Sequence, residues 1–173
     1  MKKFAHAAAL ALLLGPVAVT PTMANEWTGG YFGLGIGWSN VDGPGGRSDA
    51  VYGLHGGYDF DFGEWVVGGE FEHEIANIGL VGGAGKVSDI DRLKLKGGYD
   101  FGDFMGYALL GRARMKSDAG SGNGNVFGIG VAYSLTPNVS LGGEMTRSRF
   151  TNFAGSNDRY DVDSLMFRAS FRF

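Results

Sequence analysis

Every second residue from Leu165 to Phe173 is apolar, and the final residue is aromatic. A period of two fits a β-strand with one apolar and one polar face, because successive side chains point to opposite sides. The N-terminal segment is typical of an exported protein. Strands enter lipid only as a closed barrel, because an open sheet edge would leave backbone groups unpaired there. These features favour a barrel in a bacterial outer membrane.

Residues 1–24 predict a secretory signal peptide. Lys2 and Lys3 precede an apolar stretch that Gly15 and Pro16 interrupt, and Thr22-Met23-Ala24 offers a cleavage site with small residues. The apolar stretch is too short to span a bilayer as an anchor. We therefore expect a signal peptide over 1–24 and one domain over 25–173.

Composition narrows the class of protein. Without Lys2 and Lys3 the net charge falls from −3 to −5, an acidic balance that argues against a nucleic-acid partner. The chain has no cysteine, so no disulfide holds the exported fold. It has 32 glycines, and with 13% aromatic residues this content indicates a narrow barrel interior rather than a disordered segment.

Eight segments with alternating apolar residues follow one another. They cover residues 27–39, 50–60, 64–74, 88–101, 104–116, 125–135, 139–150 and 160–173. Their connections are short at 61–63, 102–103 and 136–138, and long at 40–49, 75–87, 117–124 and 151–159. Short turns on one side and long loops on the other are typical of outer-membrane barrels. The predicted fold is all-β: an eight-stranded antiparallel up-and-down transmembrane β-barrel with both ends periplasmic.

Charged residues gather on the face of each segment opposite the aromatic residues. Opposite charges on adjacent strands attract, and charges inside a barrel must be paired. We predict an ion-pair network in the lumen, with the apolar side chains outside. Its members are Glu70, Glu72, Arg92, Lys94, Lys96, Arg112, Arg114, Glu144, Arg168 and Arg172. The alternative is a soluble calyx, with the aromatic residues inside and the charges in water.

The opening segment, Trp27 to Trp38, and the closing segment that ends at Phe173 resemble those of small eight-stranded outer-membrane barrels of Gram-negative bacteria. This family includes the OmpA transmembrane domain, OmpX and the Omp25/opacity type. The resemblance implies a location in the outer membrane and a structural, adhesive or weakly porin-like role. It implies that Phe167, Phe171 and Phe173 form the signal read by the barrel-assembly machinery, and that lipopolysaccharide and other outer-membrane lipids surround the protein.

The sequence predicts no cofactor, no metal site and no enzyme. The motif from His73 to Asn77 lacks the second histidine of a zinc protease, and Gly85-Lys86 lacks the flanking residues of a phosphate-binding loop. Neither His55 nor His73 belongs to a recognisable group of serine, histidine and acid. We expect a monomer with a plugged lumen. A narrow ion-conducting pore is the alternative, followed by a soluble calyx and a lipid-modifying enzyme.

Overall fold

The computed structural model describes residues 27–42, 48–79, 86–117, 120–151 and 159–173, and the predicted signal peptide lies outside this part of the chain. Eight strands account for nearly all of it. They are β1 (Gly29–Asp42), β2 (Ser48–Asp61), β3 (Trp65–Gly79), β4 (Lys86–Asp100), β5 (Phe104–Ser117), β6 (Gly120–Thr136), β7 (Val139–Thr151) and β8 (Arg159–Arg172).

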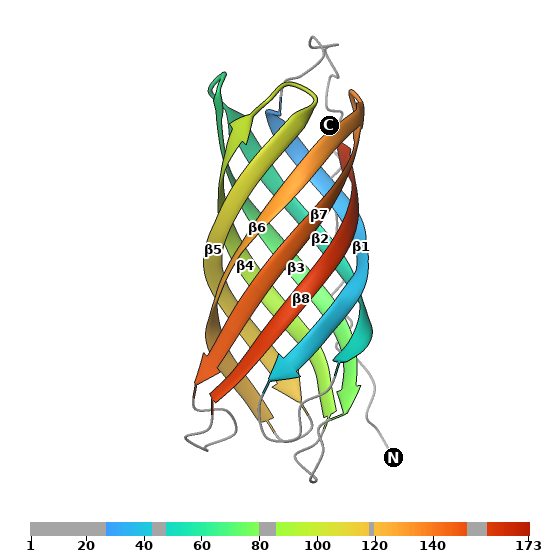
Figure 1. The fold of residues 1–173 in the computed structure, drawn as a ribbon, viewed down its shortest axis with the longest axis vertical. Helices are drawn as coiled ribbons and strands as arrows, with labels where there is room; N and C mark the ends of the chain where they lie inside the picture. Colours follow the sequence, from blue (N-terminus) through green and yellow to red (C-terminus); the bar gives the residue numbers. More distant parts are fainter. Residues whose placement is uncertain (1–26, 43–47, 80–85, 118–119, 152–158) are drawn as a thin grey trace, which may run out of the picture.

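The strands form one closed barrel, in which each strand pairs antiparallel with the next and β8 pairs with β1 (Figure 1). The last residue takes part in this closure, because the Phe173 amide donates to the carbonyl oxygen of Gly30 at 2.9 Å. No strand edge is left open. The predicted fold class is confirmed. The described residues contain no helix that could cross a membrane.

The two ends of the barrel differ. Tight connections join β2 to β3, β4 to β5 and β6 to β7 at the upper end in Figure 1, where the C-terminus also lies. We call this the turn end. The strands β1, β3, β5 and β7 finish at the opposite end, which we call the loop end. In outer-membrane barrels the short turns are periplasmic and the longer loops face the cell exterior.

Seven of the eight strands are longer than the sequence predicted, and β8 has the predicted length. They have 13 to 17 residues, although about 9–11 tilted residues suffice to cross a bilayer. The added length lies at the loop end. Residues 120–124, predicted as part of a loop, belong to β6, where Gly120 pairs with Ser117 of β5. A ladder of backbone hydrogen bonds forms there although the segment is rich in Gly, Ser and Asn, because the ladder does not depend on side chains.

The outer wall is apolar. Leu, Ile, Val and aromatic side chains of all eight strands are exposed, including Phe32, Leu95 and Phe167. Aromatic pairs gather near the turn end, such as Trp65 against Tyr99, with ring centroids 5.2 Å apart. An exposed apolar band with an aromatic girdle is what the lipid-facing wall of a barrel requires.

One strand has its faces opposite to the prediction. On β5, the side chains of Leu109 and Ala113 are buried in the lumen, whereas Leu110, Arg112 and Arg114 are exposed on the outer wall. The predicted lumen position of Arg112 and Arg114 is therefore wrong. The prediction failed because both faces of residues 104–110 are apolar, so alternation did not distinguish the faces.

The length of the turn before β5 determines which face of this strand points outward. The Phe101 amide donates to the carbonyl oxygen of Phe104 across the two-residue turn Gly102-Asp103. Because directly paired residues share a face, an outward Phe101 requires an outward Phe104 and an inward Met105. Turn length thus fixes the faces of β5 where hydrophobicity does not.

Glycine makes room for large side chains within the narrow barrel. A Cβ atom on Gly130 would overlap the ring of Tyr107, and one on Gly57 would lie 2.6 Å from the Tyr31 hydroxyl. Both tyrosine side chains pack against these glycines, and their hydroxyl groups donate hydrogen bonds to carboxylates in the lumen. The high glycine content thus has a steric cause at these positions.

Candidate functional site: the charged lumen

Ten charged side chains from five strands meet inside the barrel. Among the described residues, five carboxylates face five cations there. The carboxylates are Asp59, Glu70, Glu72, Glu74 and Glu144, and the cations are Arg92, Lys94, Lys96, Arg168 and Arg172. Equal numbers leave the lumen without net charge, which lowers the cost of enclosing these groups.

Lys94 lies at the centre of the network. Its Nζ atom is 2.7 Å from Glu70, 2.8 Å from Glu72 and 2.6 Å from Glu144. Glu70 and Glu72 are on β3 and Glu144 is on β7, so this one ammonium group links opposite walls of the barrel. Oxygens of the three carboxylates lie within 4.8 Å of one another, as metal ligands would, but the ammonium group already takes the position between them.

Arg168 of β8 makes a second bridge across the lumen. Its guanidinium contacts Glu144 and lies 2.6 Å from Glu70. The same carboxylates accept hydrogen bonds from two tyrosines, Tyr31 to Glu70 at 2.8 Å and Tyr107 to Glu144 at 2.9 Å. Each carboxylate therefore has more than one partner, as buried charges require.

Arg92 holds the network together nearer the loop end. Its Nη1 atom lies 2.7 Å from both Glu72 and Glu74, while Nε and Nη2 donate to the hydroxyl groups of Ser148 and Ser164. This guanidinium is fully buried. Its contacts join β4 to β3, β7 and β8.

A third group lies at the turn end. Asp59 of β2 is 3.0 Å from both Lys96 Nζ and Arg172 Nη2. Trp27 is buried beside them, with its ring centroid 5.4 Å from the Arg172 guanidinium carbon and its indole nitrogen donating to Asp100. The charged network thus continues from the turn end to the middle of the barrel.

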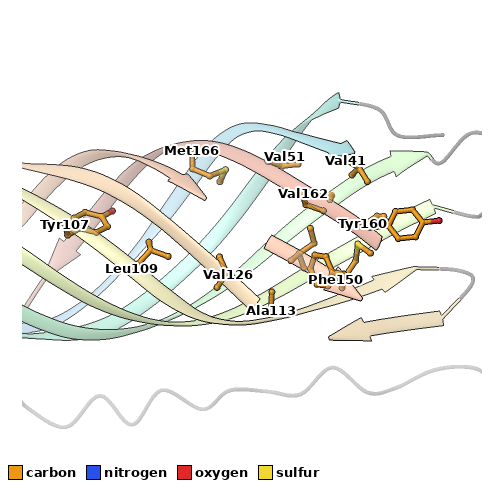
Figure 2. Packing of buried hydrophobic residues seen from close by; sticks show 14 of the residues in the cluster. Val41, Val51, Tyr107, Leu109, Ala113, Val126, Phe150, Tyr160, Val162 and Met166 are labelled. Atoms are coloured by element: carbon orange, nitrogen blue, oxygen red, sulfur yellow. The ribbon is translucent and has the colours of Figure 1, made fainter. Parts of the chain in front are cut away.

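An apolar layer closes the other half of the lumen. Figure 2 shows its side chains inside the cylinder, running from Leu109 and Val126 towards Val41, Phe150 and Val162. Val41 and Phe150 lie next to the last residues of β1 and β7, and Val162 lies near the start of β8, so the layer is at the loop end. These five side chains are almost completely buried. This layer was not predicted from the sequence, because Val41 was assigned to a loop, Leu109 was placed on the outer face, and the interior was expected to hold glycine and paired charges.

Eight of the ten predicted lumen residues lie inside the barrel. They are Glu70, Glu72, Arg92, Lys94, Lys96, Glu144, Arg168 and Arg172. Arg112 and Arg114 lie outside. Asp59 and Glu74 belong to the network although they were not among the ten predicted members. The alternation of the strands indicates both positions. Asp59 lies on the same face of β2 as His55, and Glu74 lies on the same face of β3 as Glu70 and Glu72.

A serine and a histidine meet in the lumen. The Nε2 atom of His55 lies 2.8 Å from the hydroxyl oxygen of Ser170. A cavity of about 30 Å³ lies beside Ser170, between Tyr31, Tyr107 and Arg168. A void of this size holds about one or two water molecules. His55 is buried, so a lipid or peptide has no room to approach this pair.

The three C-terminal phenylalanines lie on the outer wall. Their side chains are exposed. Phe167 and Phe171 belong to β8, which closes the barrel by pairing with β1, and Phe173 follows it directly. The Phe171 ring packs against Phe32 of β1, with centroids 5.8 Å apart. These rings therefore line the seam between the first and last strands.

Comparisons with known proteins agree with this architecture. The family model described as outer membrane protein beta-barrel domain matches residues 7–173. No curated protein matches significantly by sequence. Neisserial surface protein A (NspA) has a similar structure at 17% identity, with a TM-score of 0.60 over 84% of this chain and 98% of that one. Ail, the attachment invasion locus protein of Yersinia pestis, matches at 21% identity with a TM-score of 0.50 over 84% and 99%. At these identities the likeness shows the fold.

Proposed function

Because the chain belongs to the family of outer membrane protein beta-barrel domains, we propose that it is a structural protein of the Gram-negative outer membrane whose lumen does not conduct solutes. Export through the periplasm with removal of residues 1–24 is part of this proposal. The observation that carries it is a lumen filled by two successive layers, one of paired charges and one of apolar side chains.

The charged layer opposes the passage of an ion. A permeating ion would have to separate pairs such as Lys94 with Glu72, at 2.8 Å, or Arg168 with Glu70, at 2.6 Å. Separating a buried pair leaves an uncompensated charge in a medium of low dielectric constant, which costs several kcal/mol. The pairs cross the lumen from wall to wall, so they lie in the way of an ion that passes through the barrel.

The apolar layer opposes passage independently. Val51, Ile90 and Phe150 show no exposed surface. An ion that enters this layer loses its hydration without gaining polar partners, which is very costly. Both layers must open before solutes pass, so loss of one charge pair alone is not expected to open the barrel.

Planar-bilayer conductance tests this function. We expect no discrete conductance from the wild-type barrel, measured beside a general porin as positive control. The Glu72→Gln variant tests the charged layer and Phe150→Ser the apolar layer, and the double variant tests both. Only the double variant is expected to conduct measurably. Discrete conductance from the wild type, altered by Glu72→Gln alone, would instead establish the narrow gated pore.

The closed barrel supports a monomer, because no open strand edge is left to recruit a second copy. Partners in this proposal are the surrounding lipids and, during insertion, the barrel-assembly machinery acting on Phe167, Phe171 and Phe173. Adhesion is predicted for the long loops at 40–49, 75–87, 117–124 and 151–159. Within these loops, residues 43–47, 80–85, 118–119 and 152–158 lie outside the described residues. Adhesion by these loops stays a prediction.

We also propose that the protein is not an enzyme. The buried pair of His55 and Ser170 adjoins a cavity of only about 30 Å³, which supports a structural role for this hydrogen bond. Mass spectrometry of lipid A after overexpression tests the point. An unchanged lipid A mass is expected, and a new mass that disappears in a Ser170→Ala variant would refute it.

A further inference from the structure

Two arginines of β5 lie on the outer wall near the loop end. Arg112 and Arg114 are exposed at alternate positions of β5 and point away from the barrel. Within the described residues no carboxylate forms an ion pair with either guanidinium, and Arg112 donates only to Asn125. Their neighbour Lys116 is paired, because its Nζ atom lies 3.0 Å from Asp91.

A hollow of about 370 Å³ lies in the outer wall beside these arginines. Phe71 and Leu93 form its apolar part, and Arg112, Arg114, Asn123 and Asp91 form its polar part. Strand register explains this arrangement, because Arg112 pairs with Leu93 and Arg114 pairs with Asp91 and Asn123. The hollow is therefore amphipathic, with positive charge on its loop-end side.

The hollow lies where the apolar wall ends. Going towards the loop end, the outward side chains change from Leu110 to Arg112 on β5 and from Leu93 to Asp91 on β4. The same change occurs after Phe127 on β6. Side chains of an outer-membrane barrel leave the hydrocarbon at such a boundary. The arginines therefore lie at the height of the lipid headgroups in the outer leaflet.

We propose that this hollow is a binding site for a phosphate group of lipopolysaccharide, the anionic lipid of the outer leaflet. Each guanidinium presents a fork of donors that matches phosphate oxygens. The exposed side chains of Phe71, Leu93 and Leu110 offer a surface for the acyl chains below the phosphate. Asp91 does not repel the ligand strongly, since the Lys116 ammonium group lies 3.0 Å from its carboxylate. The Nδ1 atom of His73 is also within hydrogen-bond distance of this carboxylate, at 2.6 Å.

This inference rests on the proposed location in the outer membrane and adds a specific ligand contact to it. The competing explanation is unspecific attraction of anionic lipid to any exposed cation. The structure offers a matched comparison for this alternative. Arg147 and Arg149 are also outward on the wall near the loop end, but they face Asp163 at 2.5 Å and Asp161 at 3.8 Å.

Native mass spectrometry of the refolded barrel with purified lipopolysaccharide tests the site. We compare Arg112→Gln/Arg114→Gln with Arg147→Gln/Arg149→Gln, because both double variants remove two positive charges from the outer wall. The first is expected to weaken binding at least about tenfold, since each charge-assisted hydrogen bond contributes more than a neutral one. The second is expected to change binding less than about threefold. Heat-modifiable migration on gels verifies that both variants fold.

Dephosphorylated lipopolysaccharide and phosphatidylglycerol identify the ligand group. The wild type should bind dephosphorylated lipopolysaccharide about as weakly as Arg112→Gln/Arg114→Gln binds the intact lipid, and should bind phosphatidylglycerol more weakly than lipopolysaccharide. Equal losses in both double variants, or no effect of dephosphorylation, would overturn the site. Membrane fractionation reports the location separately, so a barrel in the outer membrane without selective binding would overturn only this inference.

Discussion

Replacing Lys94 by methionine is the most informative perturbation of the lumen. The change keeps most of the side chain's volume but removes the ammonium group that lies 2.6–2.8 Å from Glu70, Glu72 and Glu144. Three carboxylates would then converge with one cation fewer between them. Removing one partner of a buried pair costs about 3–5 kcal/mol, so we expect a loss of at least that size in the free energy of unfolding.

Urea unfolding in lipid vesicles, followed by tryptophan fluorescence, measures this loss. Lys116→Met is the matched control, because the same exchange removes an exposed ammonium group 3.0 Å from Asp91. Exposed pairs contribute about 0–1 kcal/mol, so the control should remain close to the wild type. Lys94→Met/Glu144→Gln restores a neutral lumen and should be more stable than Lys94→Met alone. Equal stability of Lys94→Met and Lys116→Met would refute the idea that the network stabilises the barrel.

Three further predictions concern other parts of the molecule. Gly130→Ala should destabilise the barrel by about 1–3 kcal/mol in the same assay, because the added Cβ overlaps the Tyr107 ring. Gly97→Ala, whose Cβ meets open space, should leave the free energy of unfolding unchanged, and equal effects of the two variants would contradict the steric account. Phe173→Ala should reduce the amount of barrel in the outer-membrane fraction of cells while leaving refolding in detergent intact, and unchanged amounts would exclude it from the assembly signal. Phe150→Ala should cost about 3–5 kcal/mol by opening a cavity in the apolar layer, and a near-neutral result in urea unfolding would show that this layer is loosely packed.

The sequence predicts the architecture well because a lipid-facing barrel imposes a strong pattern. Alternation assigns the faces of seven strands correctly, and short turns and long loops in alternation separate the strands. It also places charges such as Glu70 and Lys94 on the inward face, because a register shift of one residue would expose them to lipid. Apolar side chains inside the barrel were not predicted, although Val51 and Phe150 fill its loop end.

The remaining errors have physical causes. Residues 104–110 are apolar on both faces, so only the two-residue turn before β5 tells Leu109 from Leu110. Residues 120–124 carry weak strand propensity, and they are held in β6 by the backbone ladder with β5. Which carboxylate each cation contacts depends on strand tilt and side-chain reach across the lumen, as in the pair of Lys94 with Glu144 of β7, and no local pattern encodes such contacts.

Oxygen accessibility of spin labels on β5 tests most directly whether apolar side chains face lipid while the lumen is closed. The chain has no cysteine, so Leu109→Cys and Leu110→Cys each give a single labelling position. In vesicles, we expect a label at Leu110→Cys to collide frequently with dissolved oxygen, which concentrates in lipid, and a label at Leu109→Cys to be shielded. The opposite order, with Leu109→Cys the more accessible, would mean that β5 turns its other face outward and would contradict the structure.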